Sequence, residues 1–353
     1  MDTIRIVNWI LTRKCNLKCD YCAIVRNYAN MPDIYPTIGS YMKNQMSYQY
    51  VIEVLDMLKV HNPDVFNIFY GGEPMLFSEL HEIINHCNDN DIHYTIISNN
   101  TPEIQPLIKD LFNRTDYIQG FTSSVDPVVS NKFSGTKLDR ITKSIEGLKK
   151  LKEIQAKGKV KDVVAEITVM KNNLLYLYPL IETLTENEIS SDITFIDIAK
   201  SQFYDFSNVT DSNLLVTQED AKEIMTSLAN SKLDIHMKEI LLPAILDILP
   251  SNMNCELEKN VHNISIDANG MLRLCLRIRG VITPTICAED IIDRENDFCL
   301  SPMVKEAIAE DKKRYCKLCN HTCLLMSKII DNEESSAAEL VHLDRRQGER
   351  NAR

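Results

Sequence analysis

The chain has 353 residues, more than the roughly 100–200 of a usual single domain, so we expect one large domain with a smaller appendage. The formal net charge of −11 opposes binding to phosphate backbones, so a nucleic-acid substrate is disfavoured. No apolar run reaches the roughly 18 residues that span a bilayer, and residues 1–15 lack the order of a secretory signal. We therefore expect a cytoplasmic protein without a membrane partner.

The first 200 residues alternate strand-like and helix-like patterns. Near-continuous apolar runs, typical of buried parallel strands, cover Ile4–Leu11 and end at Tyr70, Ser98, Val125, Met170 and Ala199. Between them, apolar residues recur at the helical spacing around residues 51–58, 80–87, 104–111 and 177–184. Six successive βα units predict an α/β fold with parallel strands, closed partly or wholly into a barrel whose chemistry lies at the carboxyl ends of the strands.

The expected domains follow this pattern. They are a partial (β/α)6 TIM-like barrel over residues 1–215, a helical connector over 216–254, a small cysteine-rich α+β domain over 255–330 and a charged tail over 331–353. Ten of the eleven cysteines fall in two blocks, three at residues 15–22 and seven at 255–323. Disulfides are rare in a reducing compartment, so this clustering indicates two metal-bearing regions. The eleventh, Cys87, lies on the apolar face of a predicted helix and is expected in the core.

The first block, Cys15, Cys19 and Cys22, has the spacing C-x3-C-x2-C directly after the first predicted strand. Thiolates are the usual ligands of iron–sulfur clusters, and three of them hold three irons of a cubane and leave the fourth open. The alternative is a structural zinc knuckle. It needs a fourth ligand nearby, and residues 23–60 contain no His or Cys.

With Tyr21 before its last cysteine, this motif resembles the signature of the radical S-adenosylmethionine (SAM) superfamily. After the second strand, the sequence Gly71-Gly72-Glu73-Pro74 resembles the family's glycine-glycine-glutamate-proline turn, whose backbone binds the SAM amino group. Glycine suits a place where the backbone approaches a ligand closely. The resemblance implies a 4Fe–4S cluster whose open iron is chelated by SAM, and reductive cleavage of SAM to a 5′-deoxyadenosyl radical that abstracts a substrate hydrogen.

The resemblance extends to later strand ends and implies further SAM contacts. The third strand ends in Ser98 and Asn99, and the fourth in a segment that contains Ser124 and Asp126. Asn172 follows the fifth strand. The basic residue that pairs with the SAM carboxylate is expected at Arg140, with Lys143 and Lys132 as alternatives, although each is also compatible with an ordinary solvated charge.

The second cysteine block is similar to the C-terminal extension called SPASM, or its shortened form called twitch, which binds auxiliary 4Fe–4S clusters. A hairpin around the asparagine-glycine turn at Asn269-Gly270 is expected to bring Cys255 and Cys275 together. A full extension has a further cysteine, and none follows Cys323 here, so we expect one auxiliary cluster. Its ligands would be Cys255, Cys275, Cys316 and Cys319, with Cys323 as a possible substitute. Cys287 and Cys299 fit neither pattern, and a zinc-ribbon-like module is the alternative for the block.

Relatives with this extension include peptide maturases and enzymes that oxidise or rearrange small molecules. We expect peptide or protein modification first and a small-molecule reaction second, with a non-catalytic iron–sulfur or zinc protein as the third reading. The first strand begins within a few residues of Met1, which leaves no room for a preceding leader-binding domain, so a separate leader-peptide-binding protein is a candidate partner. A reductase, flavodoxin or ferredoxin is expected to supply the electron. Glu166 and Asp197 are the candidates for a proton-transfer residue.

Overall fold

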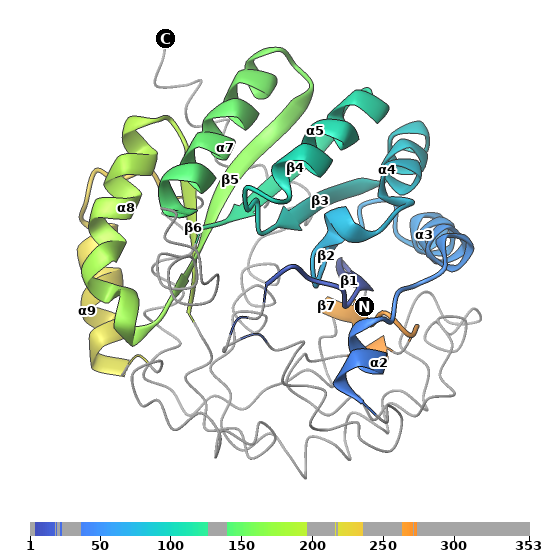
Figure 1. Ribbon diagram of the computed structural model, residues 1–353, viewed down its shortest axis with the longest axis horizontal. Coiled ribbons are helices and arrows are strands. Elements are labelled where there is room, and N and C mark those ends of the chain that lie inside the picture. Colours follow the sequence, from blue (N-terminus) through green and yellow to red (C-terminus); the bar gives the residue numbers. More distant parts are fainter. Residues whose placement is uncertain are drawn as a thin grey trace.

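In the computed structural model, the described residues are 4–17, 19, 22, 37–125, 140–195, 216, 218–235, 263–270 and 272–273. Figure 1 shows strands at the centre and helices along the outside of a curved sheet. The strands are β1 (Ile6–Thr12), β2 (Phe66–Gly71), β3 (His93–Ser98), β4 (Ile118–Ser124), β5 (Val160–Val169), β6 (Ser190–Phe195), β7 (Asn263–Ile266) and β8 (Leu272–Arg273). The α-helices are α2 (Ile38–Met42), α3 (Tyr48–His61), α4 (Leu80–Asp89), α5 (Gln105–Arg114), α7 (Arg140–Ala156), α8 (Leu174–Glu186) and α9 (Gln218–Ala229). Two short 3-10 helices, η2 (Pro74–Leu76) and η3 (Lys171–Asn173), follow β2 and β5.

The strands form one open sheet in the order β6-β5-β4-β3-β2-β1-β7-β8. Strands β1 to β6 are parallel to their neighbours, so their carboxyl ends share one edge of the sheet. Each parallel connection passes through a helix, because parallel strands need a crossover. The expected partial barrel of six βα units is confirmed.

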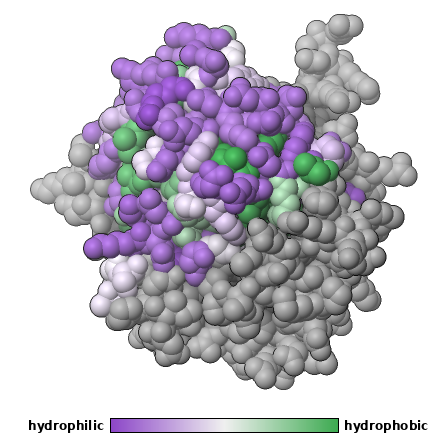
Figure 2. Space-filling model, turned by 90° about the vertical axis from the view of Figure 1, so that its right-hand side faces the viewer, coloured by the Kyte–Doolittle hydropathy of each residue, from purple (hydrophilic) through white to green (hydrophobic). Residues whose placement is uncertain are grey.

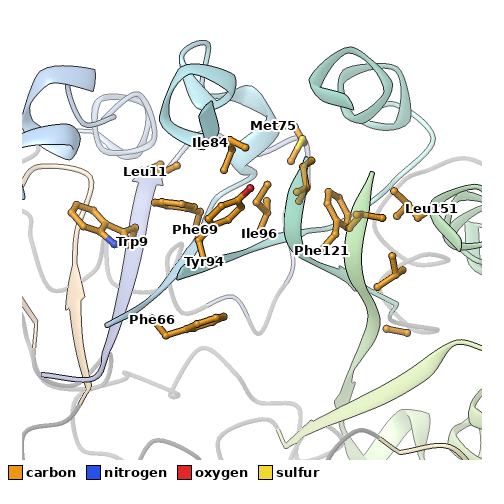
Figure 3. Close-up of a cluster of buried hydrophobic side chains, with 14 of the residues drawn as sticks. Trp9, Leu11, Phe66, Phe69, Met75, Ile84, Tyr94, Ile96, Phe121 and Leu151 are labelled. Atoms are coloured by element: carbon orange, nitrogen blue, oxygen red, sulfur yellow. The ribbon is translucent and has the colours of Figure 1, made fainter. Parts of the chain in front are cut away.

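The hydrophobic core lies between the sheet and its outer helices. Trp9 and Leu11 of β1, Phe69 of β2, Tyr94 of β3 and Ile84 of α4 belong to one cluster of buried hydrophobic side chains (Figure 3). Trp9, Leu11, Phe69, Tyr94 and Ile84 are completely buried. Burial of apolar surface contributes about 25 cal/mol per Å², so this layer is the main stabilising contribution to the fold. Cys87 is buried in the same layer, as predicted.

The hairpin expected around Gly270 is present, and its first strand extends the main sheet. β7 pairs in parallel with β1 over Ile6–Trp9 and in antiparallel fashion with β8. Gly270 has a φ of +78°, a conformation that glycine adopts readily, and its amide donates to the Asp267 carbonyl. A segment more than 250 residues from β1 in sequence therefore lies beside it (Figure 1).

The outer surface seen in Figure 2 is mostly hydrophilic where the chain is described, with apolar residues in small separate spots. This is ordinary for the solvent side of amphipathic helices. Within the described part of the chain, no helix is both long and apolar enough to cross a membrane.

Candidate functional site

The cysteine loop begins where β1 ends, at the edge of the sheet that holds the carboxyl ends of the parallel strands. Cys15, Cys19 and Cys22 are each partly buried, and the Cys22 amide donates to the Cys19 carbonyl at 3.0 Å. Burial raises the pKa of the Cys15 thiol to about 12, an increase that the hydrogen bond from the Leu17 amide (N to Sγ, 3.3 Å) partly offsets. Binding to iron would therefore have to displace this proton, as is usual for thiol ligands.

The Gly71-Gly72 turn after β2 lies directly against this loop. The Gly72 amide donates to the Thr12 carbonyl and the Glu73 amide donates to the Lys14 carbonyl, both at 2.8 Å. A Cβ on Gly72 would lie 2.1 Å from the Lys14 carbonyl oxygen, which is a severe clash with backbone. A Cβ on Gly71 would lie 2.6 Å from the Thr12 carbonyl oxygen. The two glycines are therefore required for close contact with the cysteine loop, whatever ligand the turn also binds.

The Glu73 carboxylate joins the ends of β2 and β3. Its Oε1 accepts hydrogen bonds from the Met75 amide and the Ser98 hydroxyl, and its Oε2 accepts one from the Asn99 amide at 2.8 Å. The Glu73 side chain is fully buried, and this burial raises its pKa to about 7 despite the three hydrogen bonds. Ser98 is also buried. These two side chains connect strand ends inside the protein, and Asn99 is the neighbour that reaches the cysteine loop.

Asn99 connects the end of β3 to the cysteine loop through its side chain. Its amide nitrogen lies 3.8 Å from Cys15 Sγ and 2.8 Å from Asn16 Oδ1. The Asn16 amide donates to the Thr101 hydroxyl at 2.8 Å, and the Thr101 amide donates to Asn99 Oδ1 at 3.1 Å. Asn16 and Thr101 were not among the residues expected at the site. Their positions beside Cys15 and Asn99 were the only signal in the sequence.

A row of polar residues crosses β4, β5 and β6 on the face of the sheet opposite the buried helix layer. Ser124 of β4, Glu166 of β5 and Asp192 of β6 are register neighbours, whereas the alternate residues of β5 face the buried helix layer. Burial raises the pKa of Glu166 to about 7, the nearby Asp192 carboxylate adds to the rise, and a 3.2 Å hydrogen bond from Thr194 opposes it. Glu166 is therefore close to half-protonated near neutral pH, a property that suits a proton-transfer group.

A buried ion pair lies beneath the cysteine loop. Arg13 Nε and Nη2 lie 2.9 and 2.8 Å from Asp267 Oδ1, and both side chains are almost completely inaccessible to solvent. Neither residue was expected at the site. Arg13 precedes Cys15 by two residues, but its partner is 254 residues away and no local pattern points to it.

Some of the remaining predicted site residues have a described backbone, and the others lie outside the described residues. Pro74 begins η2 directly after Glu73, Arg140 begins α7 and Asn172 lies in η3, all after strand ends. The side chains of Arg140 and Asn172 lie outside the described residues, and Lys143 is partly buried on α7. Tyr21, Asp126, Lys132, Asp197 and the seven cysteines from Cys255 to Cys323 also lie outside the described residues.

Within the described ranges, no three His, Cys, Asp or Glu side chains lie close enough to surround a single metal ion. A 4Fe–4S cluster does not need its cysteines to surround one metal ion, because each thiolate binds a different iron. Three partly buried cysteines in one loop are a donor set of the right number and chemistry for such a cluster.

Comparisons with known proteins agree with this geometry. Residues 9–183 match the model of the Radical SAM superfamily, and these residues include the cysteine loop, the Gly71-Gly72 turn and the strand ends up to β5. A 124-residue stretch is 29% identical to an S-adenosylmethionine-dependent nucleotide dehydratase from Selenomonas ruminantium. That match covers 34% of this chain and 40% of the dehydratase.

Two solved structures share the fold at low sequence identity. SuiB of Streptococcus suis, bound to its precursor peptide SuiA, superposes with a TM-score of 0.58 and 15% identity over 80% of this chain and 62% of SuiB. Native anSMEcpe with bound AdoMet and Cp18Cys peptide gives a TM-score of 0.55 and 15% identity over 97% of this chain and 98% of that one. Identities this low show a common fold alone. The match to the Radical SAM superfamily model therefore rests on residues 9–183, and the two solved structures add the shared fold.

Proposed function

We propose that Cys15, Cys19 and Cys22 hold a 4Fe–4S cluster and that the protein uses it to cleave SAM reductively. One observation carries the proposal. The cysteine loop is fastened to the Gly71-Gly72 turn by two backbone hydrogen bonds, at the carboxyl edge of a sheet that matches the radical SAM family. The three-cysteine donor set fits a cubane with one iron open. When bound, such a cluster offers that iron to the amino and carboxylate groups of SAM and supplies the electron that breaks the S–C5′ bond.

The chain's own groups would orient SAM and the cysteine loop. The N–H groups of an iron-bound amine need hydrogen-bond acceptors, so the turn that contains Gly71 and Gly72 would contribute carbonyl oxygens, because its Gly72 and Glu73 amides already bind the loop. Asn99 would hold Cys15 in place and donate to its sulfur. Ser124 is the further contact that we propose on β4, and Asn172 and Arg140 are those proposed beyond β5 and at the start of α7.

We propose a peptide or protein as the substrate class. Support comes from the two fold relatives whose structures hold a peptide, SuiB with SuiA and anSMEcpe with the Cp18Cys peptide. Glu166 is the proposed proton acceptor, because it lies between Ser124 and Asp192 in the polar row across β4, β5 and β6 and its pKa is raised to about 7. A reductase, flavodoxin or ferredoxin would supply the electron, and a separate protein would bind a leader peptide where the substrate has one.

One auxiliary 4Fe–4S cluster is part of the proposal. Its ligands would be Cys255, Cys275, Cys316 and Cys319, with Cys323 as an alternative. The support is the cysteine spacing together with the hairpin at Gly270, which precedes Cys275 by five residues. Iron and sulfide analysis of the reconstituted protein would give about eight irons per chain for two clusters and about four for one.

A small-molecule reaction is the second candidate function. The 29% identity to a nucleotide dehydratase favours it, although that match covers 34% of the chain. In that case the substrate would be a nucleotide and Glu166 would act on a sugar carbon instead of a peptide. The negative net charge counts against a highly anionic substrate.

The open iron is tested by electron paramagnetic resonance (EPR) of the anaerobically reconstituted, reduced protein. Addition of SAM should change the signal of the Cys15–Cys22 cluster, because SAM becomes a ligand. Cys15→Ala, Cys19→Ala and Cys22→Ala should each lose the SAM-sensitive signal, whereas Cys87→Ala, which changes a core thiol, should keep it. A reduced wild-type spectrum that saturating SAM leaves unchanged would contradict the proposal.

The two substrate classes are separated by the hydrogen that the radical abstracts. Uniformly deuterated candidate peptides and deuterated nucleotides are incubated in turn with reduced protein and SAM, and the deuterium content of 5′-deoxyadenosine is measured by mass spectrometry. Deuterium from a peptide supports peptide modification, and deuterium from a nucleotide supports the dehydratase reading. A short cysteine- or glycine-rich reading frame beside the gene would supply the first peptide to test.

A further inference from the structure

Arg13 is fixed on three sides at the entrance to the cysteine loop. Its amide donates to the Asn44 carbonyl at 2.9 Å. Its carbonyl oxygen is packed so closely against Gly72 that a Cβ there would approach within 2.6 Å. Its side chain is fully buried and extends to Asp267. The backbone two residues before Cys15 therefore has its position set by contacts with three separate segments.

Asp267 is equally constrained from the other side. Its Oδ1 accepts from Arg13 Nε at 2.9 Å and from the Ala268 amide at 2.7 Å, and its carbonyl accepts from the Gly270 amide. Asp267 directly follows β7, whose partner in the sheet is β1. Removing one partner of a buried ion pair leaves the other charged in a medium of low dielectric constant, so the pair constrains both segments.

The ion pair thus joins the segment that leads into the first cysteine block to a segment within the second block, between Cys255 and Cys275. Arg13 precedes Cys15 by two residues, and Asp267 precedes Cys275 by eight. The guanidinium group is planar and donates in fixed directions, so it fixes orientation as well as distance. Contacts of this kind around metal ligands hold those ligands in their binding geometry.

We propose that Arg13 and Asp267 are positioning residues that hold the Cys15–Cys22 loop ready to bind its cluster, so that assembly of the first cluster depends on the docked 263–273 hairpin. This inference rests on the proposed function for the identity of the cluster. The order of the loop before any metal binds is a separate claim and can be measured on the protein without iron.

The test uses two variants in the full-length chain. Asp267→Asn keeps an oxygen for the Ala268 amide and removes the charge that pairs with Arg13. The double variant Arg13→Met/Asp267→Asn removes both charges, so much of the stability should return while the directional link stays absent. Asn67→Leu is the matched control, because it removes the buried 2.9 Å hydrogen bond between Trp9 Nε1 of β1 and Asn67 Oδ1 of β2, away from the loop.

Two measurements are made on each variant. Hydrogen-exchange rates are corrected for the variant's free energy of unfolding, which is obtained by chemical denaturation. Hydrogen exchange of residues 15–22 is followed on the iron-free protein, and iron content is measured after reconstitution. Asp267→Asn and the double variant should exchange in this loop at least about tenfold faster than wild type and bind less than about half of the first cluster's iron. Asn67→Leu should stay within about twofold of wild type in both measurements.

Two results would overturn the proposal. The first is loop exchange and iron content in Asp267→Asn that match the Asn67→Leu control. The second is full recovery of both in the double variant, which would give the pair a role in stability alone. If Asp267→Asn does not fold, the double variant decides the question. A wild-type protein that binds iron but does not cleave SAM would defeat the proposed function and leave the exchange result standing.

Discussion

The side-chain amide nitrogen of Asn99 lies 3.8 Å from Cys15 Sγ and 2.8 Å from Asn16 Oδ1, so one side chain at the end of β3 contacts two adjacent residues of the cysteine loop. Asn99 itself is held by Glu73, which accepts a hydrogen bond from its backbone amide. Hydrogen bonds through Glu73 and Asn99 thus link the ends of β2 and β3 to Cys15.

This contact predicts an effect on the reduction potential of the first cluster. Hydrogen bonds to the sulfurs of an iron–sulfur cluster stabilise its reduced, more negative form and raise its potential. Asn99→Ala should therefore lower the midpoint potential and slow the reduction of the cluster, measured by EPR-monitored redox titration.

Thr101→Val is the control for this prediction. It removes the hydrogen bond from Asn16 to Thr101 and leaves the Asn99 amide beside Cys15. The potential should move less in this variant than in Asn99→Ala. An equal shift in both would attribute the effect to general disorder of the loop and contradict a direct hydrogen bond to sulfur.

Much of this site could be predicted from the sequence because its signals are local. Strand and helix periods predicted the βα units, and the spacing of Cys15, Cys19 and Cys22 together with the Gly71-Gly72 turn predicted the match to the radical SAM family model and the edge of the sheet at which these residues lie. The hairpin at Gly270 followed from turn chemistry. Each of these patterns is confined to a few neighbouring residues.

The contacts that organise the site could not be predicted in this way. The Arg13–Asp267 pair and the parallel pairing of β7 with β1 join residues more than 250 positions apart, and a buried Arg has the same sequence appearance as a solvated one. Gly72 was expected to make room for a ligand, and the structure shows that it also makes room for the Lys14 carbonyl. The buried, internal role of the Glu73 carboxylate likewise depends on which strands become neighbours.

The clash at Gly72 predicts a large effect from one methyl group. Gly72→Ala would place a Cβ 2.1 Å from the Lys14 carbonyl oxygen and 2.6 Å from that of Arg13, so the cysteine loop must shift. We expect iron incorporation to fall by at least about fivefold, while far-ultraviolet circular dichroism stays close to wild type, because the strain is local.

Gly39→Ala provides the comparison, since the nearest atom to its Cβ would be Thr37 Oγ1 at 3.7 Å, an ordinary contact. Iron content in this variant should equal that of wild type. Full cluster loading in Gly72→Ala would show that the loop and the turn are not closely packed in solution.

The raised pKa of Glu166 predicts a pH dependence of stability. Its pKa of about 7 in the folded protein lies above the ordinary value of 4.5, so the folded state binds more protons between these values. The stability that this group contributes is therefore fully present below about pH 4.5 and is lost as the pH rises through about 7. In Glu166→Gln that loss should be absent.

The measurement is chemical denaturation of the iron-free protein at pH 5, 6, 7 and 8, expressed as the difference between wild type and Glu166→Gln. The difference should decrease with pH and level off above about pH 8. Asp192→Asn removes the like charge beside Glu166, so this loss should be smaller and should end at lower pH in that variant. Parallel stability curves for wild type and Glu166→Gln would show that Glu166 titrates normally.

The central claim is that the Cys15–Cys22 loop supports reductive cleavage of SAM. The most direct measurement is mass-spectrometric detection of 5′-deoxyadenosine and methionine after the anaerobically reconstituted protein is reduced with dithionite in the presence of SAM. Wild type and Cys87→Ala should form both products in equal amounts, and the triple variant Cys15→Ala/Cys19→Ala/Cys22→Ala should form neither. Absence of 5′-deoxyadenosine from wild type with intact cluster absorbance, or its continued formation by the triple variant, would contradict the claim.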